Sequence, residues 1–184
     1  MFLLILGLLL WILPHLLKRA APGLRARLGD AGKGLIAVLI LAGVVLMVVG
    51  FRRAEFIPVY SPFPGAGHVN NTLMLVSLFL FGVGGTKGTL YTKMRHPMLW
   101  GLVVWATAHL LVNGDMASIV LFGCLGLWAF MEMSLINSAG QWQRPVAGRG
   151  LKGDAMNLAG TLVLYGIAAM IHQWLGHPVF LGNY

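Results

Sequence analysis

The sequence predicts an all-α fold, a polytopic bundle of about six transmembrane helices. Hydrophobic residues make up 58% of the chain and charged residues only 10%, whereas soluble globular chains average about 25% charged residues. The hydrophobic residues also gather in long runs, separated by short polar breaks. We therefore expect one membrane domain over residues 1–184.

Six apolar segments are the expected spans, since each is close to the roughly 17–25 residues that a spanning helix needs. They are residues 1–17, 34–51, 70–86, 97–113, 116–136 and 157–175. The break RRAEFIPVYSPFPGAGH contains three prolines and is expected to be a loop. The break SAGQWQRPVAGRGLKGD is expected to be another loop. Glycines within the spans predict close helix packing: Gly43, Gly123, Gly126, Gly160 and Gly166.

The distribution of basic residues predicts the orientation. Of the 13 lysines and arginines, only Arg52 and Arg53 fall outside the first, third and fifth breaks. Basic loops face the cytoplasm, so both termini are expected on the outer side of the membrane. The first apolar run has no basic residues before it, which favours a retained helix over a cleaved signal. Because the basic residues alternate with spans, the net charge of +8 predicts contact with membrane lipid and no binding of nucleic acid.

Several kinds of chemistry are excluded by the residues present. Cys124 is the single cysteine, so neither an intrachain disulfide nor a cysteine zinc site can form. The CxxCH signature of covalently attached haem is absent as well. So are HExxH, GxSxG and phosphate-binding glycine loops.

Histidines are the main candidates for a functional site. His68 and His177 are expected in outer loops, whereas His15, His96, His109 and His172 lie in or at the edge of spans. An ionisable residue inside a span is costly and points to function, and neutral imidazole is a common ligand of metals and of haem iron. Depth along the helices favours either His109 with His172 or His15 with His96, and both pairings stay open.

Other polar residues near the spans have two readings each. Glu132 is expected to pair with Arg95 or Arg144, or to anchor its helix at the interface. Asn113 and Asp115 follow His109 closely, and Asn113 either holds the second nitrogen of the imidazole or caps the helix end at the NGD turn. His96 precedes Pro97, a residue that suits the first turn of a helix, so Arg95 and His96 are expected at the inner membrane surface.

The combination of RHPMLWG with WATAHLLVNGD resembles the NnrU family of bacterial membrane proteins, named for a link to nitric oxide metabolism. LRARLG, GLIAVLILAGVVLMVVGFRRA, PVYSPFP and LMLVSLFLF fit the same family, so the resemblance extends to about residue 135. The family in turn resembles the plant 15-cis-zeta-carotene isomerase, a membrane enzyme with b-type haem. That resemblance implies that His15 and His109 are axial ligands of haem b and that Arg95, His96 and Pro97 form a matching segment. Ala106 stands where the isomerase has a cysteine.

Three functions follow as expectations. The first is a haem b protein that supports nitric oxide metabolism or denitrification by sensing, electron transfer or assembly, with a denitrification component or a second copy of the chain as partner. Arg95 and His96 are then expected near a haem propionate, because arginine binds carboxylates in a bidentate manner. The second is a haem-dependent isomerase of a membrane isoprenoid. The third is a transporter or scaffold without a cofactor.

Overall fold

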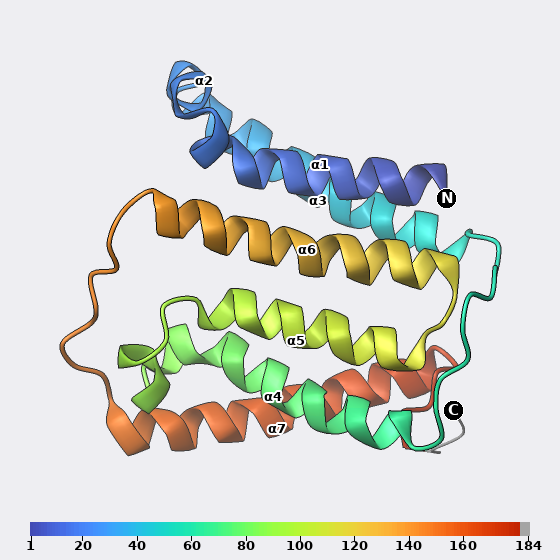
Figure 1. Cartoon of the computed structure of the whole chain (residues 1–184). Helices are drawn as coiled ribbons and strands as arrows, with labels where there is room; N and C mark the ends of the chain where they lie inside the picture. Colours follow the sequence, from blue (N-terminus) through green and yellow to red (C-terminus); the bar gives the residue numbers. More distant parts are fainter. Residues whose placement is uncertain (181–184) are drawn as a thin grey trace. The chain divides into compact units, whose positions relative to one another are not determined.

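The computed structural model describes residues 1–180, and all of its regular elements are helices. The long helices are α1 (Phe2–Ala20), α3 (Ala31–Arg52), α4 (Ala66–Thr86), α5 (Pro97–Val112), α6 (Met116–Ser138) and α7 (Gly150–Trp174) (Figure 1). Two short elements, α2 (Pro22–Arg27) and the 3-10 helix η1 (Thr89–Thr92), lie between them. Over the described residues there is no β-strand, only an isolated bridge between Pro58 and Asp115. The predicted all-α class is confirmed.

Each predicted span has its helix. Five helices are long and apolar enough to cross a membrane, namely α1, α3, α4, α6 and α7. The helix α5 is apolar but has 16 residues, which at 1.5 Å per residue gives a length of about 24 Å. Residues 1–180 therefore contain five long apolar helices and one shorter one, as in a polytopic membrane protein.

The chain folds into two compact units, each made of two stretches of sequence. The first unit contains residues 1–60 and 114–140, and therefore α1, α2, α3 and α6. The second contains residues 61–113 and 141–184, and therefore α4, η1, α5 and α7. The two units are described separately below.

In the first unit, α1 packs most extensively against α3 and also against α6. Glycines make the α1–α3 contact possible. A Cβ atom at Gly43 would lie 2.8 Å from the carbonyl oxygen of Gly7 and 2.9 Å from the backbone nitrogen of Trp11. The predicted role of Gly43 in close helix packing is therefore confirmed.

The other glycines predicted to pack closely differ among themselves. Gly126 is buried on α6. Gly123, Gly160 and Gly166 have open space where a Cβ atom would lie, so the prediction is wrong for these three among the described residues.

In the second unit, α4 is the central helix and packs against both α5 and α7. Buried polar side chains join these helices. Ser77 donates a hydrogen bond to the Gly101 carbonyl at 2.8 Å, and Asn157 donates one to the Phe79 carbonyl at 2.9 Å. These bonds use backbone acceptors because a lone hydroxyl or amide between apolar helices is costly without a partner.

Two of the predicted loops are shorter than expected. The helix α7 begins at Gly150, well before the predicted span, because its polar first turns make tertiary contacts. Asp154 accepts hydrogen bonds from the backbone nitrogen and the hydroxyl of Thr89. The helix α4 begins at Ala66, after Gly65 takes the left-handed φ of 88° that ends the loop.

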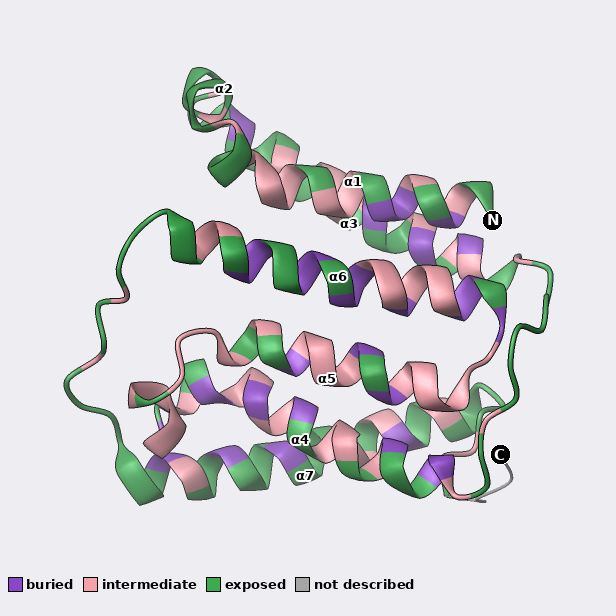
Figure 2. Ribbon diagram, viewed as in Figure 1, coloured by how far each residue is buried: buried purple, intermediate pink, exposed green. Residues whose placement is uncertain are grey.

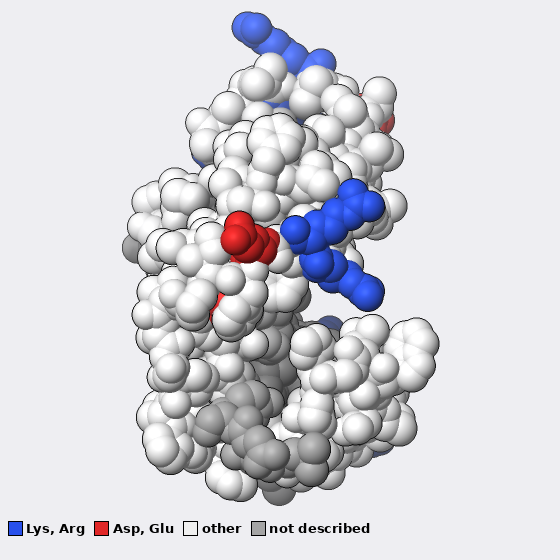
Figure 3. Space-filling view, turned by 90° about the vertical axis from the view of Figure 1, so that its right-hand side faces the viewer, with Lys and Arg blue, Asp and Glu red and all other residues white. Residues whose placement is uncertain are grey.

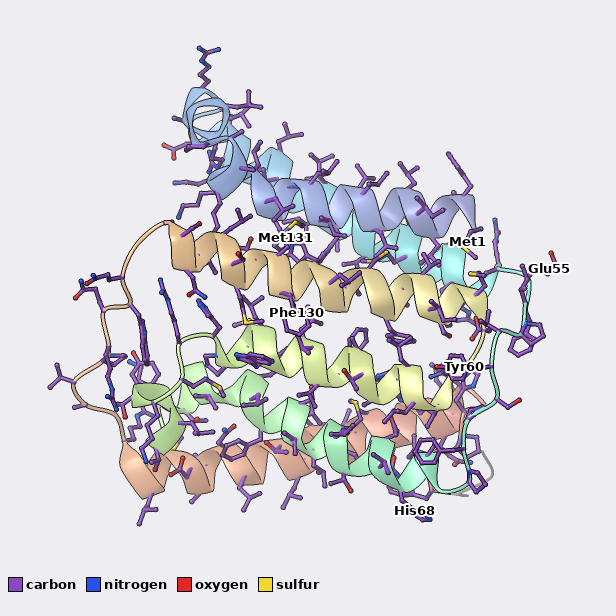
Figure 4. All side chains as sticks on the ribbon, viewed as in Figure 1. Met1, Glu55, Tyr60, His68, Phe130 and Met131 are labelled. Carbon is purple, nitrogen blue, oxygen red and sulfur yellow. The ribbon has the colours of Figure 1, made fainter. Side chains whose placement is uncertain are left out.

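The two histidines expected in outer loops have different positions. His68 lies in the first turn of α4 rather than in a loop (Figure 4), because the loop ends earlier than the hydrophobic pattern indicates. His177 lies beyond the end of α7, as expected. Both side chains are exposed.

Many large apolar side chains on these helices are exposed. Val38, Leu41 and Val45 on α3 and Leu162 and Val163 on α7 are all more than half exposed. Figure 2 shows exposed and buried residues mixed along the helices. The face in Figure 3 consists mostly of uncharged residues, with lysine and arginine in a few separate groups. Apolar exposure on this scale is typical of helices that lie in a membrane.

Candidate functional site

In the first unit, His15 lies on α1 among aromatic rings. Its Nδ1 is 2.6 Å from the carbonyl oxygen of Trp11, one turn earlier. The rings of Trp11 and His15 are 4.2 Å apart between centroids, and the Trp128 ring on α6 lies 5.4 Å from His15 at an interplanar angle of 71°. The imidazole is thus held by its own helix on one side and by α6 on another.

An ion pair lies one turn further along the same two helices. Arg19 Nη1 is 2.5 Å from Glu132 Oε1, so within the first unit the partner of Glu132 is Arg19, which was not among the expected arginines. Sequence could not choose among the arginines, because the α1–α6 contact depends on tertiary packing. Glu132 is 5% exposed, and burial of a charge requires a partner of this kind.

Two buried polar atoms on α6 remain unsatisfied beside this pair. Neither Trp128 Nε1 nor Glu132 Oε2 has a hydrogen-bond partner in the described part of the chain. The two residues are four positions apart and therefore lie on one face of the helix. His15, Arg19, Trp128 and Glu132 thus form a polar cluster where α1 meets α6.

In the second unit, His109 lies near the end of α5 in a similar local setting. Its Nδ1 is 2.8 Å from the carbonyl oxygen of Trp105, and the Trp105 and His109 ring centroids are 4.8 Å apart. The Asn113 amide donates to the His109 carbonyl at 2.9 Å, which satisfies one of the last carbonyls of α5. Asp115 caps α6 by accepting from the backbone nitrogen of Ser118 at 3.0 Å. Of the two readings of the NGD turn, helix capping is confirmed.

The two histidines share a Trp-x-x-x-His pattern, in WILPH and in WATAH. A carbonyl oxygen can only accept a hydrogen bond, so Nδ1 carries the proton in both rings. A neutral imidazole then has its lone pair on Nε2. Ligand histidines in metal sites are commonly fixed by such a bond to a backbone carbonyl. The pattern at His15 could have been found from the sequence, because the four-residue spacing is visible there.

His172 has the same hydrogen-bond arrangement, with Nδ1 at 2.8 Å from the Ala168 carbonyl. It belongs to the same unit as His109. His15 lies in the other unit. Of the two pairings that depth favours, His109 with His172 is therefore the one whose members share a unit.

Arg95 and His96 lie at the opposite end of α5 from His109. His96 is the residue before the first turn, and Pro97 takes the first helical position, as the RHP motif predicts. At 1.5 Å per residue, His96 and His109 are about 20 Å apart along the helix. Both Arg95 and His96 are half-buried. Arg95 and His96 thus lie at one end of α5, and His109 lies near the other end.

Within residues 1–180 there is no group of three or more histidine, cysteine, aspartate or glutamate side chains that could hold a metal ion. Haem iron needs fewer protein ligands than a bare metal ion, because the porphyrin supplies four nitrogens and axial residues complete the coordination. A single well-oriented histidine, or two, is the relevant feature for that cofactor.

The whole chain was compared with known proteins and protein families. No curated protein and no solved structure matches the chain. The family model described as NnrU protein matches residues 3–179, which is nearly the whole chain. The match includes both Trp-x-x-x-His patterns, the RHP motif and the six apolar helices apart from Phe2 at the start of α1, and it extends well beyond residue 135. This chain therefore belongs to the NnrU family.

Proposed function

We propose that this protein binds haem b in the membrane, with His15 and His109 as axial ligands, and that it supports nitric oxide metabolism or denitrification by sensing, electron transfer or assembly. The observation that carries the proposal is the hydrogen bonding of the two imidazoles. In each, Nδ1 is engaged with a backbone carbonyl one turn earlier, which leaves Nε2 as the nitrogen that can bind iron.

The surroundings of the two histidines suit a porphyrin. Each imidazole lies against a tryptophan of its own helix, and the helices are apolar along most of their length. Neutral imidazoles add no charge to the interior, so ligation avoids the cost of burying one. Bound haem would supply an iron centre that exchanges electrons or binds a diatomic gas.

Arg95 and His96 are proposed to serve the haem propionates rather than the iron. Arginine forms planar bidentate contacts with carboxylates, and the RHP segment lies at the end of α5, where a polar group can reach the membrane surface. If Arg95→Ala left haem occupancy and reduction potential unchanged, this role would be wrong.

The choice of His15 as the partner of His109 comes from the family resemblance. A second pairing, His109 with His172, has its own support, because both residues lie in one unit and both have Nδ1 at 2.8 Å from a backbone carbonyl one turn earlier. The two pairings predict that different alanine variants lose the low-spin haem signature. One set of variants therefore distinguishes them.

The test is the visible spectrum of the purified full-length protein, followed by single alanine replacements of His15, His96, His109 and His172. We expect a Soret band in the parent protein. We also expect loss of the low-spin signature in His15→Ala and His109→Ala only. His68→Ala and His177→Ala are matched controls, because both side chains are exposed.

Three results would contradict the proposal in different ways. A parent protein without a Soret band after haem reconstitution would favour the transporter or scaffold. Loss of the low-spin signature in His172→Ala, together with its retention in His15→Ala, would replace the proposed ligand pair by His109 and His172. Turnover of a polyene would favour the isomerase, a reading weakened here by Ala106 in the position of the isomerase cysteine.

A further inference from the structure

A cavity of about 630 Å³ that is open to the outside lies at the start of α7 and is lined by the exposed side chains Arg149, Lys152 and Met156. It belongs entirely to the second unit, and none of its lining residues is part of the proposed haem site. Two of the three side chains are cationic and the third is apolar. The cavity therefore joins a positively charged part to a hydrophobic part.

The backbone around this cavity is held in place by close contacts. The Arg149 nitrogen donates to the Lys87 carbonyl at 2.6 Å. A Cβ atom at Gly153 would lie 2.6 Å from the Thr86 carbonyl oxygen and 2.7 Å from the Gly88 nitrogen. Only glycine permits this approach, so the first turn of α7 is fixed against the segment that follows α4. The cationic side chains thus project from a defined backbone.

The two cations are not neutralised by neighbouring carboxylates. Among the described residues, neither Arg149 nor Lys152 lies within ion-pair distance of an acidic side chain. The nearest acidic residue in sequence, Asp154, accepts hydrogen bonds from Thr89. The pair therefore presents positive charge to whatever enters the cavity.

The order of the lining residues along α7 matches the order of groups in a phospholipid. Met156 lies one turn beyond Lys152, on the same face of the helix, and about 6 Å further along it. Arg149 and Lys152 lie at the end of the apolar helix, where the bilayer surface is expected, and Met156 lies on the acyl-chain side of them. Basic pockets at the ends of spanning helices are suited to anionic headgroups.

We propose that this cavity binds the headgroup of an anionic phospholipid, with Arg149 and Lys152 on the phosphate and Met156 against the acyl chain. Charge complementarity argues for an anionic lipid, and the apolar wall argues for a lipid rather than a free anion. The site is independent of haem, so its test does not depend on the proposed function.

The test compares lipids retained by the purified full-length protein in native mass spectrometry, after exchange into equal amounts of phosphatidylglycerol and phosphatidylcholine. We expect the parent protein to retain phosphatidylglycerol in preference. Arg149→Gln with Lys152→Gln should reduce that preference on the order of tenfold, because each cation near the bilayer surface attracts anionic lipid. The control is Lys18→Gln with Arg27→Gln, which removes one lysine and one arginine, both exposed, from the first unit.

The charge-preserving variant Arg149→Lys with Lys152→Arg guards against a folding defect and should retain the lipid. Equal retention of the two lipids by the parent would overturn the proposal. An equal loss of the preference for phosphatidylglycerol in the control variant would also overturn it, because that result would indicate general attraction of anionic lipid to the basic surface. Displacement of the lipid by millimolar inorganic phosphate would point to a free anion as the occupant and would also overturn it.

Discussion

At the scale of single residues, the arrangement around His15 depends on a side chain from another helix. Trp128 is 6% exposed and contacts both Trp11 and His15, with ring centroids 4.4 Å and 5.4 Å away. Its indole nitrogen is unsatisfied among the described residues. The ring therefore contributes by packing, and removal of its N–H should cost little.

We expect Trp128→Ala to lower the free energy of unfolding by about 3–5 kcal/mol, the range for deletion of a buried aromatic side chain. Trp128→Phe should cost clearly less, because it keeps an aromatic ring and removes an unpaired donor. Reversible unfolding in detergent measures both. Equal losses in the two variants would mean that the indole nitrogen has a partner after all.

Tyr60 offers a second test at this scale. It lies on the connection after α3 (Figure 4), outside the spans, and burial together with the negative charge of Asp115 raises the pKa of its hydroxyl above the usual value near 10. A raised pKa in the folded state means that folding favours neutral tyrosine. The contribution of Tyr60 to the free energy of unfolding is complete at pH values below its pKa in the unfolded chain. It is lost as the pH rises through its pKa in the folded protein.

The protein should therefore lose stability above about pH 10, and Tyr60→Phe should make the difference in stability between pH 7 and alkaline pH smaller. Thermal unfolding at both pH values, on both proteins, measures that difference. An identical alkaline loss in the variant would contradict the assigned interaction with Asp115.

At the scale of helices, the α1–α3 contact depends on small residues. Gly7 and Gly43 bring the two backbones so close that any side chain at Gly43 meets backbone atoms of α1. Without water to expel between helices, such close packing is a main source of stability in a membrane. The glycines of this protein are therefore not equivalent, although many lie in apolar helices.

We expect Gly43→Ala to destabilise the protein by about 1–3 kcal/mol, the cost of overpacking a close contact. Gly123→Ala is the matched control. It lies in α6 with no atom within 4 Å of an added Cβ, and alanine has the higher helix propensity, so stability should stay equal or rise. Both are measured by unfolding in the same detergent. A neutral Gly43→Ala would show that α1 and α3 can move apart without cost.

At the scale of the whole molecule, the basic residues alternate with the helices. All but Arg52 and Arg53 fall in the breaks after the first, third and fifth apolar segments. Cytoplasmic loops carry such an excess, so the charge pattern predicts a definite orientation for a chain with an even number of spans.

A reporter fused after Tyr184 should therefore indicate the periplasm, and one inserted in the break before α7 should indicate the cytoplasm. Alkaline phosphatase and a fluorescent protein are suitable reporters, because each is active on one side of the membrane only. A cytoplasmic C-terminus would mean that one of the six helices, most simply the 16-residue α5, does not span.

The sequence by itself determined the number and approximate position of the long helices, because bilayer thickness sets the length of an apolar run. It also placed Pro97 at a helix start and Asp115 at a cap, since both depend on local backbone chemistry. Only the tertiary structure decided that Glu132 pairs with Arg19, that Trp128 lies against His15 and that Gly43 rather than Gly123 lies in a close contact. These depend on which faces of distant helices meet, and in uniformly apolar helices no sequence periodicity marks the contacting face.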